Sequence, residues 1–320
     1  MPAVSIAIRA FRRRWLAEAM ASVLTQTHRD LELVIYDDAG DLEALATATG
    51  DPRVRYHRAE ERRTASGRFT AAVAQCRGEY IGILDDDDAY APGFVAALVQ
   101  TLDSDPQCGV AFCRSTWDDG GKLIVPTDPR PGGRQADYAA SMLRNGWWTP
   151  FSEMLIRRSA LEAALREEPL PPDVGPDTFI NLRIALAGWA HVLVDGRLSR
   201  RRWHASQLSR TFPVADDMSV ATFRRLVIAD PILMAVRDRQ LARSHLVRAL
   251  SALRAGDLPE ARVDVGAAVS LAPAAWRAER RALALAVACG PAGVLAARLW
   301  AAWSPRGRMR AHPPDRIGHH

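Results

Sequence analysis

The sequence predicts an α/β fold: a mostly parallel sheet flanked by helices, with an α-helical C-terminal extension. Two observations lead to this fold class. Over roughly the first third of the chain, short runs rich in β-branched residues alternate with segments whose apolar residues recur at helical spacing. Such alternation is typical of parallel sheets covered by helices. From about Asp216 onward strand signals become rare, and Ala, Leu and Arg recur at helical spacing.

The first third of the chain carries four predicted strands, each followed by a predicted helix. The strands are expected at Val4–Ile8, Leu31–Tyr36, Arg53–His57 and Tyr80–Leu84. The helices are expected at Trp15–Leu24, Asp41–Ala48, Arg68–Cys76 and Pro92–Leu102. Proline is tolerated in the first turn of a helix, where the amide needs no intrahelical partner. We therefore expect the last of these helices to begin at Pro92.

The middle of the chain is less regular. Strands are predicted at Cys108–Cys113 and Glu153–Arg157, with a Gly/Pro-rich loop, residues 126–133, between them. A helix is predicted over residues 177–187, because Gly188 is a plausible C-terminal stop. A final hairpin is predicted from His191–Val194 and Leu198–Trp203. These elements predict a domain over residues 1–212, with halves at about 1–115 and 116–212.

The C-terminal region is predicted to be helical over residues 213–304, with a disordered tail at 305–320. Residues 246–273 form two predicted helices joined by Gly256 and Asp257, which resemble one tetratricopeptide-like hairpin. Because an array needs at least three repeats, a helical appendage on the main domain is the favoured interpretation. Residues 291–303 and their basic flank could form an amphipathic helix that rests on a membrane surface, or one that packs on the protein.

The composition of the chain limits the kinds of ligand and partner that it is expected to bind. The net charge is +5, and charged and hydrophobic residues make up 25% and 48% of the chain, as in ordinary soluble domains. A basic balance favours an anionic ligand or membrane surface. The absence of zinc-finger spacing and of an aromatic-basic motif argues against nucleic acid. Four cysteines without a CxxC pair predict buried free thiols. With no signal peptide or membrane-spanning apolar run, we expect a cytoplasmic protein, with peripheral contact at the inner face of the membrane as an alternative.

An acidic run, Asp85–Asp88, directly follows the fourth predicted strand. Carboxylates on such a support suit Mg²⁺ or Mn²⁺, which prefer oxygen ligands. On extended backbone Asp85 and Asp87 would share one face, leaving Asp88 for a capping role. Asp37 and Asp38 end the second strand, and ligands of parallel sheets collect where the strands end. A solvated acidic loop is the alternative.

Longer segments carry a family resemblance. These are VSIAIRAF (4–11), SVLTQT (22–27), LELVIYDDAG (31–40), GEYIGILDDDDAYAP (78–92) and DTFINLRIALAGWAHVLVDGRLSRRRWHASQLS (177–209). In this order and spacing they resemble the family 2 inverting glycosyltransferases, nucleotide-diphospho-sugar transferases with the GT-A fold. The resemblance covers residues 4–210, about two thirds of the chain. It implies a Rossmann-like GT-A domain that transfers a sugar from a nucleotide diphosphate donor to an acceptor hydroxyl, with inversion and with Mg²⁺ or Mn²⁺. A UDP-sugar is the favoured donor, and other nucleotides stay open.

The resemblance also implies roles for individual positions. Asp177 falls on the general base. Asp87, Asp85 and His204 are the implied metal site. The implied nucleotide-sugar contacts are Arg9, Ala10, Phe11, Asp38, Arg68, Asp85, Asp86 and Arg202. Trp147 and Trp148 are aromatic, and aromatic rings suit the apolar faces of sugars, so these residues could form a platform for the acceptor. A role in the core or in a lid is equally open.

The chain departs from the family pattern at two places. The usual Pro-Thr-Tyr-Asn after the first strand is Arg9-Ala10-Phe11-Arg12, which puts the usual base contacts in doubt. Asp177 is the only carboxylate left in its motif; a helix N-cap is the alternative to the favoured role as base, and one residue could do both. Two alternative functions therefore stay open. A nucleotidyltransferase would normally carry a Gly-rich phosphate loop, which RAFRRR lacks. A non-catalytic scaffold would use a degenerate transferase domain and the helical region.

Overall fold

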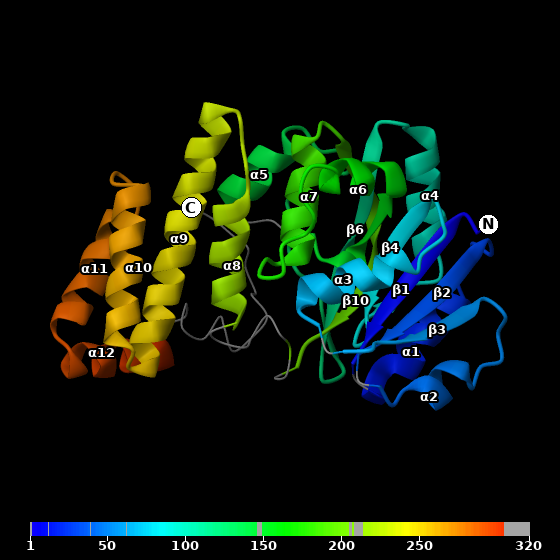
Figure 1. Ribbon diagram of the computed structural model, residues 1–320, viewed down its shortest axis with the longest axis horizontal. Helices are drawn as coiled ribbons and strands as arrows, with labels where there is room; N and C mark the ends of the chain where they lie inside the picture. The colour runs from blue at the N-terminus through cyan, green and yellow to red at the C-terminus, as the bar shows by residue number, and fades with distance from the viewer. Residues whose placement is uncertain are drawn as a thin grey trace. The chain divides into compact units, whose positions relative to one another are not determined.

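The computed structural model describes residues 2–11, 13–38, 40–61, 63–145, 149–204, 207 and 214–303 (Figure 1). The chain divides into two compact units. The first contains Met1–Met142 and Trp147–His204. The second contains Leu143–Gly146 and Ala205–His320.

The first unit is built on one sheet with strand order β3-β2-β1-β4-β9-β6-β10-β5. In that order the strands are Val54–Arg58, Leu31–Asp37, Val4–Ala10, Tyr80–Asp85, Met154–Arg157, Cys108–Asp119, Ala190–Arg202 and Ala89–Tyr90. Two short strands extend it: β7 (Lys122–Ile124) pairs with β6, and β8 (Gly133–Arg134) pairs with β10. The pairs β1–β2, β1–β4, β2–β3 and β6–β10 are parallel, and β9 runs antiparallel to both β4 and β6. The predicted mostly parallel sheet is confirmed.

Helices lie on both faces of this sheet (Figure 1). They are α1 (Arg13–Leu24), α2 (Glu43–Thr47), α3 (Ala65–Ala74), α4 (Phe94–Ser104), α5 (Tyr138–Asn145), α6 (Arg158–Leu165) and α7 (Pro176–Leu186), with a 3₁₀ turn, η1 (Phe151–Glu153). All seven residues of β2 are buried, as expected for a parallel strand covered on both faces. Leu16 and Met20 of α1 pack in one core cluster with Ile6 and Leu33. Removing these apolar side chains from water is the main force that holds helix to sheet.

Three expectations are wrong in detail. Pro92 lies in the turn before α4, which begins at Phe94. The final hairpin does not exist, because both of its halves belong to the single strand β10, which runs parallel to β6 with register shifts between them. Gly196, at φ +118, lies where the pairing is interrupted, a backbone conformation that favours glycine. The cysteines are free, but Cys289 is exposed rather than buried.

The second unit is helical, as predicted. It contains α8 (Val214–Arg225), α9 (Pro231–Ala255), α10 (Leu258–Leu271), α11 (Arg277–Ala288) and α12 (Pro291–Trp303). Gly256 ends α9 in the left-handed conformation, and the Asp257 side chain caps α10 by accepting a hydrogen bond from the Glu260 amide. The predicted helical pair and its Gly-Asp turn are thus present. Residues 305–320 lie outside the described part of the chain.

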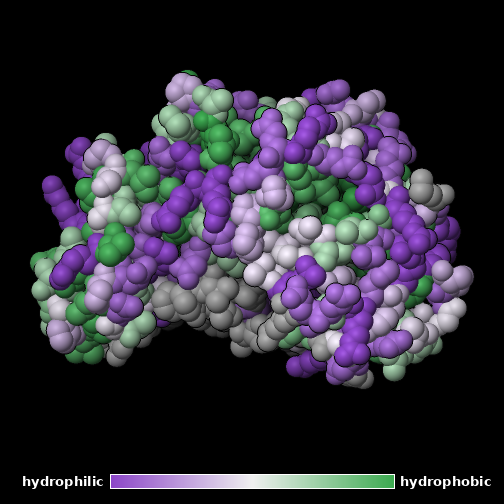
Figure 2. Space-filling view, in the orientation of Figure 1, coloured by the Kyte–Doolittle hydropathy of each residue, from purple (hydrophilic) through white to green (hydrophobic). Residues whose placement is uncertain are grey.

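Apolar and polar residues are interspersed on the visible face of these helices (Figure 2). Among the described residues, none of the helices combines the length and the apolar character that a bilayer crossing requires.

Candidate active site

The strand register brings the predicted polar residues to one edge of the sheet. Across the parallel ladders, Ala10 of β1 pairs with Asp37 of β2, and Arg9 pairs with Asp85 of β4. The Asp38 amide donates to the Ala10 carbonyl at 2.9 Å, which extends this contact past the strand ends. Ala10 is buried and contributes its backbone here. The residues after β1, β2 and β4 therefore meet, as the parallel topology predicts.

Asp38 and Arg68, both predicted nucleotide contacts, form an ion pair. Arg68 Nη1 lies 3.1 Å from Asp38 Oδ2, and the carboxylate is fully buried. The Arg63 amide donates to the other oxygen of Asp38 at 3.3 Å. Phe11, which is 40% exposed, leaves its ring accessible to a planar ligand. Its amide donates to Asp86 Oδ2 at 2.6 Å.

The acidic run folds differently from the predicted alternation. The ligand oxygens of Asp85, Asp87 and Asp88 lie within 4.8 Å of one another, and Asp86 points to Phe11 instead. The reason is that β4 ends at Asp85 and a turn follows, so strand alternation no longer applies. The capping role expected for Asp88 is also wrong, because its Oδ1 accepts the Arg202 amide of β10 at 2.9 Å.

Three carboxylates this close fit a hard divalent cation, and the oxygen donor set suits Mg²⁺ or Mn²⁺. Burial raises the pKa of Asp88 well above its usual range, and the neighbouring Asp87 raises it further. Burial also raises the pKa of Asp85, but Arg9 outweighs it and holds that pKa below its usual value. Ionising all three carboxylates together is therefore unfavourable without a compensating cation.

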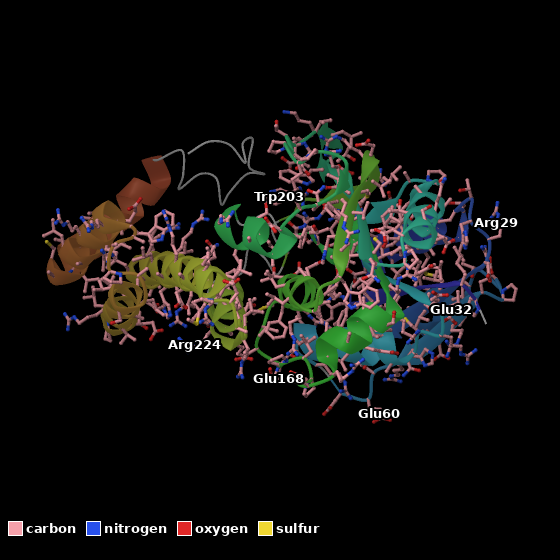
Figure 3. All side chains as sticks on the ribbon, turned by 90° about the horizontal axis from the view of Figure 1, so that it is seen from above. Arg29, Glu32, Glu60, Glu168, Trp203 and Arg224 are labelled. Atoms are coloured by element: carbon pink, nitrogen blue, oxygen red, sulfur yellow. The ribbon has the colours of Figure 1, made fainter. Side chains whose placement is uncertain are left out.

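Basic side chains already touch the cluster. An Arg9 Nη2–Asp85 ion pair closes the side next to β1. His204 Nε2 lies 2.7 Å from Asp87 Oδ2, so the structure makes His204 the partner of a predicted metal ligand. Arg202 donates from its guanidinium to the Asp87 carbonyl at 3.0 Å. Between these two residues, Trp203 (labelled in Figure 3) stacks on Trp117 and anchors the end of β10.

Asp177, the predicted base, lies in the first turn of α7. Gly175 occupies the N-cap position and Pro176 begins the helix, so the N-cap alternative for Asp177 is wrong. Its Oδ1 accepts the Thr178 amide at 2.7 Å. Burial raises the pKa of Asp177, while the Thr178 bond and Arg9 lower it and Asp85 raises it. Arg9 and Asp85 both affect the pKa of Asp177, which makes Asp177 a candidate member of the same site.

Sequence reasoning missed a segment that supports this site, Thr149–Glu153. The Ser152 hydroxyl accepts the Asp85 amide at 3.2 Å. The Phe151 ring lies 5.2 Å from the Arg9 guanidinium carbon. Glu153, buried and with a pKa raised by burial, accepts the Ser115 hydroxyl at 2.7 Å. No recognisable motif marks this segment.

Arg201 belongs to the basic run Arg200–Arg202, whose charge is expected to help neutralise a leaving diphosphate, although only Arg202 was predicted as a nucleotide-sugar contact. The Arg201 Nη1 atom lies 4.0 Å from Glu153 Oε1. Glu153, Asp88, Asp85 and Asp177 all raise the pKa of Arg201 against the opposing effect of burial. The period-2 alternation of a strand places Arg201 and Arg202 on opposite faces of β10, so the two arginines meet different partners. Trp147 and Trp148 lie outside the described residues.

The chain is similar in sequence to a known protein family and to several of its members. The family model described as "Glycosyl transferase family 2" matches residues 5–165. An uncharacterized glycosyltransferase of Nostoc sp. is 28% identical over 211 residues, 62% of this chain and 65% of that protein. The putative colanic acid biosynthesis glycosyl transferase WcaA of Escherichia coli is 34% identical over 103 residues, 31% of this chain and 37% of that protein. The chain thus spans less than two thirds of the length of these relatives.

Two solved structures share the fold. S. aureus TarS 1-349 in complex with UDP-GlcNAc superposes with a TM-score of 0.67 at 14% identity, over 94% of this chain and 91% of that one. The mannosyltransferase PcManGT from Pyrobaculum calidifontis, in complex with GDP-Man and Mn²⁺, gives 0.57 at 21% identity, over 94% and 87%. At these identities the likeness concerns the fold alone. The family model covers half of the chain, however, and on that ground this protein belongs to glycosyl transferase family 2.

Proposed function

We propose that this chain transfers a glycosyl group from a nucleoside diphosphate sugar to an acceptor hydroxyl, with inversion at the anomeric carbon. The observation that carries the proposal is that Asp38–Arg68 and the Asp85–Asp87–Asp88 cluster lie at one sheet edge, in a member of a glycosyltransferase family. Asp177 of α7 adds to it, because Arg9 and Asp85 of that edge affect its pKa. Ligands of α/β sheets bind at such an edge.

The nucleotide would lie over the ends of β1 and β2. Asp38 offers carboxylate oxygens to a base N–H, Phe11 offers a ring for stacking, and Arg68 fixes Asp38 in place. The complexes of the two fold neighbours contain UDP-GlcNAc and GDP-Man, which supports a nucleotide sugar as donor. We infer a UDP-sugar, with a GDP-sugar as the alternative.

Asp85, Asp87 and Asp88 would hold Mg²⁺ or Mn²⁺, with His204 orienting Asp87. When bound, the metal would neutralise the negative charge that grows on the leaving diphosphate. Arg201, whose pKa is raised by Glu153, Asp88, Asp85 and Asp177, would add a fixed positive charge near the same group. Arg202 would hold Asp87 and Asp88 in position. Its guanidinium donates to the Asp87 carbonyl, and its backbone amide donates to the Asp88 carboxylate.

Asp177 would take the proton from the acceptor hydroxyl. Its raised pKa makes it a better proton acceptor than an exposed aspartate, as general base catalysis requires. A base that delivers the acceptor oxygen on the face opposite the diphosphate leads to inversion without a covalent enzyme intermediate. Trp147 and Trp148, which precede the Thr149–Glu153 segment, stay the proposed acceptor platform.

The two alternative functions, nucleotidyl transfer and a non-catalytic scaffold, have less support. Nucleotidyl transfer has no support from the matched family, and a non-catalytic scaffold does not explain an intact cluster of three carboxylates beside a buried aspartate. Cytoplasmic localisation, and membrane contact through residues 291–303 and their basic flank, stay predictions.

The test uses purified full-length chain, Mn²⁺ and a panel of UDP- and GDP-sugars. We expect nucleoside diphosphate release from at least one donor, and none from Asp87→Ala. The anomeric configuration of the product, read by proton NMR, should be opposite to that of the donor. Release of pyrophosphate with a nucleotide-linked product would establish nucleotidyl transfer instead, and unchanged turnover in Asp87→Ala would refute the metal assignment.

A further inference from the structure

Among the residues that the structure describes, the hydrogen bond and ion pair of the Arg9 side chain go to Asp85 of the acidic cluster. Arg9 lies at the end of β1, directly across the ladder from Asp85, and its Nη2 contacts Asp85 Oδ1. The Arg9 side chain is 13% exposed, whereas that of Asp85 is 42% exposed. The Nε atom of Arg9 is buried without a hydrogen-bond partner among the residues that the structure describes. An unmade bond of a buried donor is unfavourable, so this arrangement leaves Arg9 under-satisfied.

The same carboxylate is a metal-ligand candidate. Asp85 shares its 4.8 Å cluster with Asp87 and Asp88. A guanidinium is charged at every accessible pH, so Arg9 and a divalent ion at Asp85 would repel each other at short range. Arg9 therefore acts against metal binding for as long as it stays on Asp85.

A diphosphate changes this balance. It brings several anionic oxygens, and the planar fork of arginine matches such groups with paired hydrogen bonds. The Arg9 guanidinium also lies over the Phe151 ring, with 5.2 Å between its central carbon and the ring centroid, a flat support on which it can turn without losing contact. Contact with a diphosphate would satisfy the remaining N–H groups of Arg9 and release Asp85.

We propose that Arg9 is a built-in counter-ion that competes with the divalent metal for Asp85 and moves to the diphosphate when the donor binds. The inference rests on the proposed function for its second half, since the donor must carry a diphosphate. The consequence is coupling: metal and nucleotide bind more tightly together than either binds alone, and by linkage the coupling is the same in both directions.

The first experiment measures Mn²⁺ binding to the full chain without nucleotide, from the free Mn²⁺ signal in electron paramagnetic resonance. We expect Arg9→Gln and Arg9→Met to lower the Mn²⁺ dissociation constant by at least about tenfold, because each removes the competing charge. Arg9→Met keeps an unbranched stem against Phe151, so it serves if Arg9→Gln folds poorly. Arg9→Lys keeps the charge and should bind Mn²⁺ like the unchanged protein.

Arg55→Gln is the matched control. It removes one arginine from a carboxylate pair in the same sheet, with Arg55 Nη1 3.0 Å from Glu32 Oε2. Glu32 (labelled in Figure 3) is paired with Ser5 near the start of β1, away from the Arg9 end. Unchanged Mn²⁺ affinity in Arg55→Gln would exclude a general effect of net charge. Unchanged or weaker Mn²⁺ binding in both neutral Arg9 variants, or tighter binding in Arg9→Lys, would overturn the proposal.

The second experiment repeats the Mn²⁺ titrations with UDP and with GDP. In the unchanged protein we expect the nucleotide that binds to tighten Mn²⁺ binding, and in Arg9→Gln we expect this gain to shrink by at least about tenfold. An equal gain in both proteins would overturn the transfer of Arg9 to the diphosphate. If neither nucleotide binds, the proposed function fails and the second half of this inference fails with it, while the Mn²⁺ competition is still decided by the first experiment.

Discussion

Each unit contains an aspartate that is at least partly buried and has cationic neighbours, and the two differ in how completely that aspartate is paired. In the second unit Asp264 is fully buried and accepts from His245 Nδ1 at 2.7 Å, and from Arg248 Nε and Nη2 at 2.8 and 2.7 Å. Burial raises the pKa of Asp264, but these bonds outweigh it and lower that pKa. In the first unit Asp177 keeps a raised pKa, because its partners do not offset its burial.

The difference separates a structural ion pair from a reactive one. A fully satisfied buried network rigidifies the fold, whereas an incompletely satisfied one stores the energetic imbalance that a ligand can relieve. Arg9 and Arg201, both at the acidic cluster, have buried Nε atoms without partners among the described residues. The Asp264 network therefore stabilises the helices, whereas the unsatisfied arginine atoms of the first unit lie at the candidate site.

Charge is distributed just as unevenly. Residues 1–204 carry 25 Lys and Arg against 28 Asp and Glu, whereas residues 205–320 carry 17 Arg against nine acidic residues. The basic excess of the chain thus lies in its C-terminal part. The basic total pointed to an anionic ligand, but the unit with the candidate site is itself slightly acidic. Local cations, including a metal, would have to attract the donor there.

The largest effect is expected from Asp177→Asn. Loss of a general base lowers the rate by about 10²–10⁴-fold, measured as nucleoside diphosphate release with acceptor present. Because burial raises the pKa of Asp177, the base becomes protonated earlier as the pH is lowered. The value of kcat/KM should therefore begin to fall at a higher pH than it would with an aspartate of ordinary pKa. The folded state binds this proton more tightly than the unfolded state does. The free energy of unfolding therefore decreases as the pH rises from the ordinary aspartate pKa through the raised pKa of Asp177. The variant should therefore be at least as stable at neutral pH, and a large drop in its melting temperature would contradict this assignment.

Asp264→Asn should mainly affect stability. Removing one partner of a buried ion pair costs about 3–5 kcal/mol, since His245 and Arg248 lose their anion. Hydrogen exchange measured by mass spectrometry should show faster exchange in α9 and α10. Because the pKa of Asp264 is lowered in the folded state, its ion pairs stabilise the fold fully at pH values above the ordinary aspartate pKa. This stabilisation is lost as the pH falls through the lowered pKa of the folded state. Exposed Glu279→Gln is the control, and equal exchange in both variants would contradict the comparison.

Asn181→Ala should give an intermediate effect in the first unit. Asn181 donates to the Thr149 and Asp177 carbonyls at 3.2 and 2.9 Å, and lies 3.2 Å from His191 Nε2. His191 is fully buried, and burial lowers its pKa to about 3, so it is neutral. Leaving these groups unpaired costs about 1–3 kcal/mol in denaturant unfolding. A variant as stable as the parent would show that this network, unlike that of Asp264, does not hold the fold.

Asp257→Ala should have the smallest effect, about 1 kcal/mol, because it removes the N-cap of α10. Asp230→Ala removes the equivalent cap of α9, where the side chain accepts two amides. Chemical denaturation should show similar losses for both. A loss as large as that of Asp264→Asn would mean that the cap, rather than the buried ion network, holds the helical pair together.

Periodic patterns predicted most of the fold. Strands β1, β2 and β4 and the helical pair α9–α10 lie where apolar spacing and turn residues placed them, because those signals depend on neighbours in the chain. The β10 hairpin was wrong for the opposite reason. A bent strand and a hairpin share the same local pattern, and only pairing with β6 distinguishes them.

The sequence by itself determined the family, the sheet edge where the site lies, and the residues Asp38, Asp85, Asp87, Asp177 and His204 as candidates. Tertiary structure alone decided how they pair. Asp88 joined the cluster and Asp86 left it because a turn replaced the strand after Asp85. Arg201 and Glu153 entered the site from β10 and the η1 turn, segments about 50 residues apart in the chain. Electrostatic partners are set by distances through space, and no spacing along the chain encodes those distances until the sheet is assembled.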